Sequence, residues 1–208
     1  MGKIGMPVAL LKMGTSRGKH SGNALAFALE AMEERYTSDP DVDRSLTKNN
    51  IYGDGMFTSG LSLFKHWMEK ASEHVGYDKL GRRKAVKKNA NIAMAMIVKP
   101  DTSIMNMLRP EHQKKLLMNC YDLIKQEYDK LDIVIDAYVI HLDEANPHMH
   151  IFSHDTTYTL SDKINSPKFF IKLNKDIPEK LRAMGWTMVE KRASKELFRT
   201  RRRVLCQH

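Results

Sequence analysis

Cysteines and long apolar runs are both scarce in this sequence. Only two cysteines occur, Cys120 and Cys206, and they lack the paired spacing of a zinc ribbon or a disulfide framework. No run approaches the roughly 18 apolar residues of a transmembrane helix, and the start of the chain lacks the apolar core of a signal peptide. We therefore expect reduced thiols, no membrane segment and a cytoplasmic location.

Internal repeats and low-complexity segments are also absent. A chain of 208 residues is long enough to bury one sizeable hydrophobic core and short for two. We predict one domain over residues 1–198, followed by a basic C-terminal tail over residues 199–208.

Acidic residues are outnumbered by basic ones, 25 to 34, which gives a formal net charge of +9. This balance is typical of a surface that meets a polyanion, so nucleic acid is the predicted partner. Clustered cations favour phosphate binding because they release counterions. The candidate contacts are Arg17, Lys19, Arg82, Arg83 and Lys84. An ordinary solvated surface is the alternative for each of them.

Local patterns predict strands interleaved with helices. Short apolar runs predict strands at residues 8–11, 92–98, 133–140 and 148–153. Apolar residues at steps of three and four predict helices near residues 23–35, 61–68, 111–130 and 169–184. Residues 37–60 are rich in turn formers and predict an irregular connection or a small hairpin. The order indicates an α+β fold, an antiparallel β-sheet with helices packed on one face.

The segment from His141 to His150 carries the most informative chemistry. Side chains alternate along a strand, so His148 and His150 share one face. If the intervening residues form a hairpin turn, His141 lies opposite them and completes a site of three imidazole nitrogens. Three protein ligands leave positions open for water or substrate, as a catalytic metal requires. An ordinary polar strand surface is the alternative for one or two of these histidines.

Two carboxylates lie in the predicted turn, Asp143 and Glu144. Such groups can orient a ligating imidazole, hold a metal-bound water or transfer a proton. We assign Glu144 to the catalytic set, while a solvated turn is an equal alternative for Asp143. His154 has the same parity as His148, and we expect it on the surface or supporting a ligand rather than acting as a fourth ligand.

The string H-L-D-E-x-x-P-H-M-H at His141–His150 closely resembles the signature of the Mob/Pre (MobV-type) relaxases of mobilisable plasmids. These belong to the wider HUH class, named for two histidines separated by a hydrophobic residue. A Lys-Met, Gly-rich and Lys-His sequence near the start and Arg83-Lys84-x-Val86 before a strand follow the order of the family. The resemblance implies an HUH-relaxase-like sandwich with the histidine cluster on a central hairpin.

The resemblance also implies a site- and strand-specific DNA nickase that serves conjugative mobilisation. Members of the family cut one strand of supercoiled plasmid DNA at the transfer origin, stay covalently bound to the new 5′ end and later rejoin it. Their histidines hold a divalent ion, typically manganese (Mn2+), with Mg2+, Zn2+ and Ni2+ as alternatives. The implied partners are single-stranded and supercoiled plasmid DNA. Relaxases of this family usually continue into a coiled-coil region, so a dimer would form through regions absent from this sequence.

The attacking residue is assigned by position. MobV-type relaxases use a histidine near the N-terminus, and the residue at that position is His20. The family motif has an arginine three residues later, whereas here Ser21-Gly22-Asn23 follow and Arg17 lies upstream. A loop residue that contacts phosphate is therefore the alternative role for His20. Tyr36 and Tyr52 are alternative nucleophiles, because most relaxases of the wider class attack with tyrosine.

Two other functions stay open at this point. The first is a non-catalytic DNA-binding module or transcriptional autoregulator, in which the histidines persist without an engaged nucleophile. The second is a replication or transposition endonuclease of the same two-histidine class that uses tyrosine.

Overall fold

The computed structural model describes residues 2–13, 21–32, 42–53, 57, 59–77, 80–86, 90–159, 163–164 and 167–190. Four residues singled out from the sequence lie outside these ranges, namely Arg17, Lys19, His20 and Tyr36, as does the predicted tail over residues 199–208. Within the described ranges, no helix is both long and apolar enough to span a membrane.

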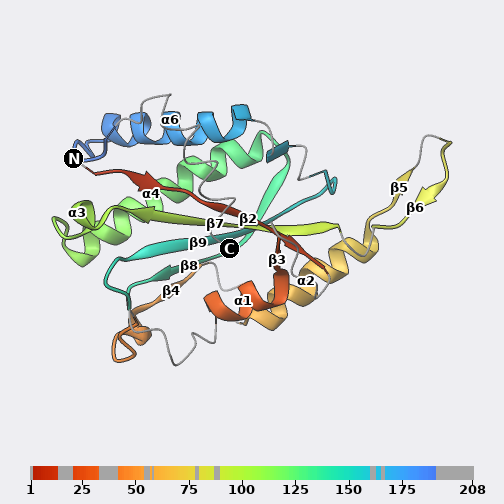
Figure 1. Cartoon of the computed structure of the whole chain (residues 1–208), viewed down its shortest axis with the longest axis horizontal. Helices are drawn as coiled ribbons and strands as arrows, with labels where there is room; N and C mark the ends of the chain where they lie inside the picture. The colour runs from red at the N-terminus through yellow and green to blue at the C-terminus, as the bar shows by residue number, and fades with distance from the viewer. Residues whose placement is uncertain are drawn as a thin grey trace.

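A seven-stranded sheet forms the centre of the molecule (Figure 1). Its main path runs through β3 (Ser21–Asn23), β2 (Val8–Lys12), β7 (Asn91–Pro100), β9 (His148–Asp155), β8 (Ile133–His141) and β4 (Ile51–Tyr52). A further strand, β1 (Ile4–Gly5), pairs with β7. All the described pairs in this sheet are antiparallel apart from β2 and β3, which run parallel. The four predicted strands and the α+β class are confirmed.

Helices α4 (Pro110–Asp129) and α6 (Pro167–Ala183) cover one face of the sheet (Figure 1). Because strand side chains alternate, Met149 and Ile151 point to this face and are fully buried with the apolar side of the two helices. Pro110 opens α4, where its missing N–H is not needed. Gly185 follows α6 with φ +99°, a left-handed conformation that suits the end of a helix.

Helices α1 (Ala24–Met32) and α2 (Gly60–Glu73) pack on the opposite face (Figure 1). A capping box at Ser59 opens α2. Leu63 and Trp67 of α2 are fully buried there with Phe152 of β9. The helices that were predicted to pack on one face of the sheet are therefore α4 and α6. The prediction was incomplete, because α1 and α2 bury part of the other face. Leu61 begins the apolar repeat that predicted this helix, yet it is 45% exposed, whereas Leu63 is fully buried against the sheet.

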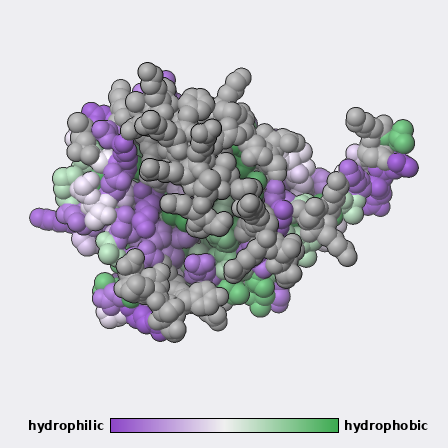
Figure 2. All heavy atoms as spheres, in the orientation of Figure 1, coloured by the Kyte–Doolittle hydropathy of each residue, from purple (hydrophilic) through white to green (hydrophobic). Residues whose placement is uncertain are grey.

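The remaining elements are short. They are the 3-10 turn η1 (Thr47–Asn49), the helix α3 (Thr102–Met105) and a separate two-stranded ribbon of β5 (Gly76–Tyr77) and β6 (Arg83–Lys84). The ribbon projects from the body of the molecule, and Figure 2 shows it to be largely hydrophilic. Arg82, Arg83 and Lys84 are exposed on it, and Leu80 near its turn is 76% exposed.

Candidate metal centre

Strands β8 and β9 form the predicted hairpin. His141 pairs directly with His148, and His150 pairs with Val139. Opposed residues of antiparallel strands lie on the same face, so the three histidines share the face that points away from α4. Their ring centroids are 4.8 to 5.0 Å apart. The structure thus brings together the three side chains that the sequence predicted to converge.

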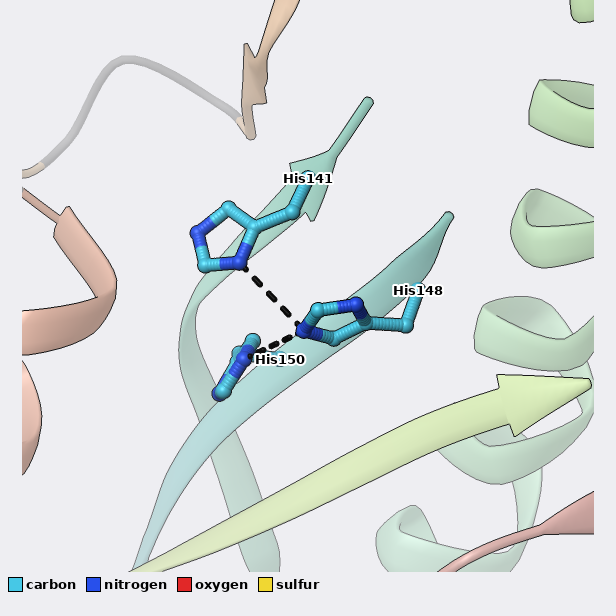
Figure 3. Close-up of side chains that lie close together, drawn as sticks. All are labelled: His141, His148 and His150. Atoms are coloured by element: carbon cyan, nitrogen blue, oxygen red, sulfur yellow. Dashed lines mark hydrogen bonds between the residues drawn. The ribbon is translucent and has the colours of Figure 1, made fainter. Parts of the chain in front are cut away.

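The nitrogens that face one another are Nδ1 of His141, Nε2 of His148 and Nε2 of His150 (Figure 3). His148 Nε2 lies 3.4 Å from His141 Nδ1 and 3.0 Å from His150 Nε2. Ligand nitrogens about 2.1 Å from one divalent ion are themselves about 3.0–3.4 Å apart, for bond angles between octahedral and tetrahedral values. The observed separations are those of a metal-binding group of ligands.

The outer nitrogen of His141 fixes the tautomer of that ring. His141 Nε2 lies 2.9 Å from the backbone carbonyl oxygen of Ala31, in the last turn of α1. A carbonyl oxygen only accepts hydrogen bonds, so Nε2 carries the hydrogen. In the neutral ring, Nδ1 therefore presents a lone pair to the centre of the cluster.

His148 is oriented in the same way. Its Nδ1 lies 3.2 Å from the carbonyl oxygen of Asn146 and 3.2 Å from Oε2 of Glu144. Both groups accept, so Nδ1 carries the hydrogen and Nε2 presents a lone pair. Two lone pairs 3.4 Å apart cannot form a hydrogen bond with each other, whereas a cation between them satisfies both. The donor set therefore fits a divalent metal ion.

Glu144 was predicted to be catalytic. The structure places its carboxylate beside the outer nitrogen of His148, on a side chain that is 12% exposed. A carboxylate in this position orients a ligating imidazole and raises its basicity. Positioning of His148 is the role that this contact supports, and proton transfer by Glu144 stays a prediction.

Asp143 is not part of a solvated turn, because it is only 1% exposed. Its carboxylate accepts a hydrogen bond from the Thr47 hydroxyl at 2.8 Å, and its backbone carbonyl accepts one from the N–H of Asp43 at 2.7 Å. Nearby, the Leu142 N–H donates to the Asn50 side chain at 2.7 Å. The segment around η1, predicted as an irregular connection, is thus fastened to the turn that carries the histidine signature.

His154 was expected on the surface or behind a ligand. It is 6% exposed, and its Nδ1 lies 2.8 Å from a carboxylate oxygen of Asp136. It lies four residues beyond His150 on β9, roughly 13 Å along the strand, so it supports none of the three clustered histidines. Neither Asp136 nor its other neighbour His66 was predicted from the sequence. The lone acidic residue inside the apolar run of residues 133–140 was the available signal.

The candidate nucleophiles and DNA contacts are only partly described. Tyr52 of β4 lies opposite Val139, which in turn lies opposite His150, so Tyr52 is on the histidine face, where it is 46% exposed. His20 and Tyr36 lie outside the described residues, as do Arg17 and Lys19. The ribbon residues Arg82, Arg83 and Lys84 are not brought to the histidine hairpin but lie on the projecting β5–β6 unit (Figure 1).

Solved structures that share this fold include those of a relaxase domain. An Mn-bound structure of the MobM relaxase domain with oriT DNA of plasmid pMV158 matches with a TM-score of 0.70, over 92% of this chain and 90% of that one, at 15% identity. A second Mn-bound structure of the domain with oriT DNA matches with a TM-score of 0.66, over 88% and 87% of the two chains, at 16% identity. The architecture is therefore that of a relaxase domain.

The family follows from the sequence match. The Mob_Pre family model, described as plasmid recombination enzyme, matches residues 30–195, and the chain belongs to this family. A plasmid recombination enzyme of a Bacillus species is 28% identical over 119 residues, which are 57% of this chain and 26% of that protein. The type 2 enzyme of Staphylococcus aureus is 28% identical over 121 residues, with the same shares. The match spans about a quarter of these relatives, and the predicted Mob/Pre resemblance is confirmed.

Proposed function

We propose that this chain is the DNA-nicking domain of a plasmid relaxase, with residues 1–198 as the domain and residues 199–208 as a basic tail. It cleaves one strand at a transfer origin and stays joined to the new 5′ end, in the service of conjugative mobilisation. The observation that carries the proposal is the convergence of three imidazole nitrogens at the separations of metal ligands. Membership of the plasmid recombination family supports DNA as the substrate.

The proposed metal ligands are His141, His148 and His150. A divalent ion held there supplies positive charge to the oxygens of the scissile phosphate and so eases attack on an anionic group. Mn2+ is the proposed ion, because the MobM relaxase domain of the same fold was solved with Mn bound. The Ala31 carbonyl and the Glu144 carboxylate hold the outer N–H groups, so the inner lone pairs are directed before the ion arrives.

The proposed nucleophile is His20, by resemblance to the family. Its ring nitrogen would form a bond to phosphorus while the bond to the 3′ oxygen breaks, and the departing oxygen takes up a proton to become a 3′ hydroxyl. The phosphoryl linkage to the protein keeps the bond energy needed for rejoining. Tyr52 is the alternative that the geometry favours, because it is exposed on the histidine face.

A trapped intermediate identifies the attacking residue. A suicide oligonucleotide nicked at the origin prevents rejoining, and peptide mass spectrometry then locates the 5′-phosphoryl adduct. We expect the adduct on His20, lost in His20→Ala and retained in Tyr52→Phe. An adduct that survives His20→Ala and disappears in Tyr52→Phe would instead place the chain with the tyrosine-dependent endonucleases.

The proposed partners are single-stranded and supercoiled plasmid DNA. Arg17 and Lys19, which are near His20 in the sequence, are proposed to contact phosphates, and so are the ribbon cations Arg82, Arg83 and Lys84, which lie away from the histidine hairpin. Exposed cations on a projecting ribbon suit contact with the backbone, because such contacts need charge rather than a shaped pocket.

Nicking of a supercoiled plasmid tests the function as a whole. The substrate carries the transfer origin of the replicon that encodes this chain, and the products are resolved on a gel. We expect open circles with Mn2+, none with a chelator, and none with His148→Ala. His112→Ala is the matched control, because His112 is exposed on α4 far from the cluster in sequence and outside it in space. Binding to the origin without any nicking would identify a non-catalytic DNA-binding module.

A further inference from the structure

A second group of metal-ligating side chains combines one residue from each of the two strands that carry the first group with a residue of a helix. His66 of α2, Asp136 of β8 and His154 of β9 each offer one ligand atom, and these three atoms lie within 4.8 Å of one another. The residues come from three separate elements, so only the folded chain brings them together. None of them has a part in the proposed nicking reaction.

The carboxylate of Asp136 is the centre of this group. Its Oδ1 lies 2.8 Å from Nδ1 of His154 and 3.3 Å from Nε2 of His66. His154 Nδ1 also lies 2.9 Å from Oδ2, so that imidazole spans both carboxylate oxygens. Around one ion, ligand atoms are about 3.0–3.4 Å apart, so both of these separations from Oδ1 are within a few tenths of an ångström of ligand spacing.

Trp67 holds the carboxylate in place. Its Nε1–H donates to Oδ2 of Asp136 at 2.9 Å, on the side away from His66. A fixed hydrogen-bond donor on Oδ2 orients the carboxylate and leaves Oδ1 to act as the metal ligand. Supporting hydrogen bonds have this role around bound metals. The β-bulge between Ile135 and Ala137 places Asp136 beside His154 across the strand pair.

The group is buried but has a route to solvent. The side chains of Asp136 and His154 are 3% and 8% exposed, whereas that of His66 is 21% exposed. Close by, the buried hydroxyl of Tyr158 has no hydrogen-bond partner among the described residues. Burial, together with the charge of Asp136, raises the pKa of Tyr158 to about 12, so the hydroxyl keeps its proton and can donate to a bound water.

We propose that His66, Asp136 and His154 form a second divalent-metal site, suited to Zn2+ or a similar transition-metal ion, which fastens α2 to the β8–β9 hairpin. Two imidazoles and one carboxylate are ligands that such ions accept, with a fourth position left for water. The two groups are roughly 13 Å apart along β9, far more than the ~4 Å of paired catalytic ions, so the second ion acts on stability rather than on phosphate.

Metal stoichiometry tests the proposal without any DNA. The metal-stripped full chain is loaded with Zn2+, freed of loosely bound ion, and its bound zinc is measured by mass spectrometry. His148→Ala leaves the second group intact, and His66→Ala leaves the first intact. We expect each single variant to hold one Zn2+ fewer than the wild type, and the double variant two fewer. His112→Ala should match the wild type. Loss of nicking without loss of the second ion would count only against the proposed function.

Thermal unfolding gives an independent readout. Zn2+ should raise the Tm of His148→Ala and leave that of the double variant unchanged, because only the former keeps the second group. His66 is on a helix surface and partly exposed, and its removal leaves Asp136 bonded to Trp67 and His154, so the variant should fold; circular dichroism in chelator checks this. Equal zinc content and equal Tm responses in His148→Ala and the double variant would overturn the proposal.

Discussion

Replacing Glu127 by glutamine tests how the two helices on one face of the sheet are held together. Glu127 of α4 is only 4% exposed, yet its carboxylate meets three lysines. Lys130 Nζ lies 2.8 Å and Lys180 Nζ 3.2 Å from Oε1, and Lys172 Nζ lies 2.8 Å from Oε2. Burial alone would raise the pKa of Glu127, but the hydrogen bonds from the lysines outweigh it and lower the pKa from 4.5 to about 2.

The size of the effect follows from that pKa. A lowering of this extent corresponds to at most about 3 kcal/mol of stability at neutral pH. The three lysine side chains are 39% to 56% exposed, so solvent screens the attraction. We expect Glu127→Gln to lower the free energy of unfolding by about 1–2 kcal/mol at pH 7. Because the folded-state pKa is the lower one, the contribution is present above pH 4.5 and is lost as the pH falls towards 2.

Urea denaturation at neutral pH and near pH 3 measures the difference between wild type and Glu127→Gln. The difference should shrink to less than half of its neutral value near about pH 3. Glu111→Gln is the matched control on the same helix, since that side chain is 64% exposed, and it should change little at either pH. A difference that stays the same at both pH values would refute the assignment to an ionised Glu127.

Three further substitutions test the metal centre, the contact between α1 and α2, and the β5–β6 ribbon. Glu144→Gln keeps an acceptor beside His148 but removes its charge, so calorimetry should show affinity for Mn2+ reduced by about tenfold. Gly60→Ala would place a Cβ 2.4 Å from the backbone carbonyl of Ala28, so thermal unfolding should show a loss of about 1–3 kcal/mol as α1 and α2 separate. Removing the three cations of Arg82–Lys84 should reduce the magnitude of the negative slope of log K against log salt by about 2–3 in DNA-binding titrations.

Each of these has a control within the chain. Glu111→Gln should leave Mn2+ affinity unchanged, and equal affinities in both variants would count against the role of Glu144. Gly76→Ala is the control for Gly60→Ala. Its added Cβ would lie 3.4 Å from the nearest atom, the Lys84 carbonyl oxygen, so stability should change little. Lys114→Ala with Lys115→Ala removes exposed charge from α4. An equal fall in salt dependence there would show that the ribbon has no special part.

The histidine cluster could be predicted because its determinants are local. The alternation of a strand places His148 and His150 together, and the short connection from His141 forces a hairpin. The same alternation sends Met149 into the core. A shift of the strand register by one residue would move every side chain of β9 to the opposite face of the sheet. The alternation along β9 therefore determined both the histidine cluster and the packing beneath it.

The contacts that the sequence did not reveal are between distant segments. Asp136 contacts His66 only because β8 carries a bulge and α2 packs on that face of the sheet. Neither feature can be predicted from the local sequence. Thr47 meets Asp143 across 96 positions of sequence. The burial of Leu63 in place of Leu61 depends on how α2 is rotated about its axis, which apolar spacing leaves open.

The hydrogen bond between His141 and Ala31 links the ligand set to a helix that supplies no ligand. Carbonyls in the last turn of a helix are the negative end of its dipole, so they favour an imidazole N–H pointing at them. Without that carbonyl, the imidazole of His141 can carry its hydrogen on Nδ1 instead of Nε2. Nδ1 then has no lone pair to offer to a metal ion. Substitutions that unwind the end of α1 would thus mimic the loss of His141 itself, and a genetic screen for inactive variants should find them there.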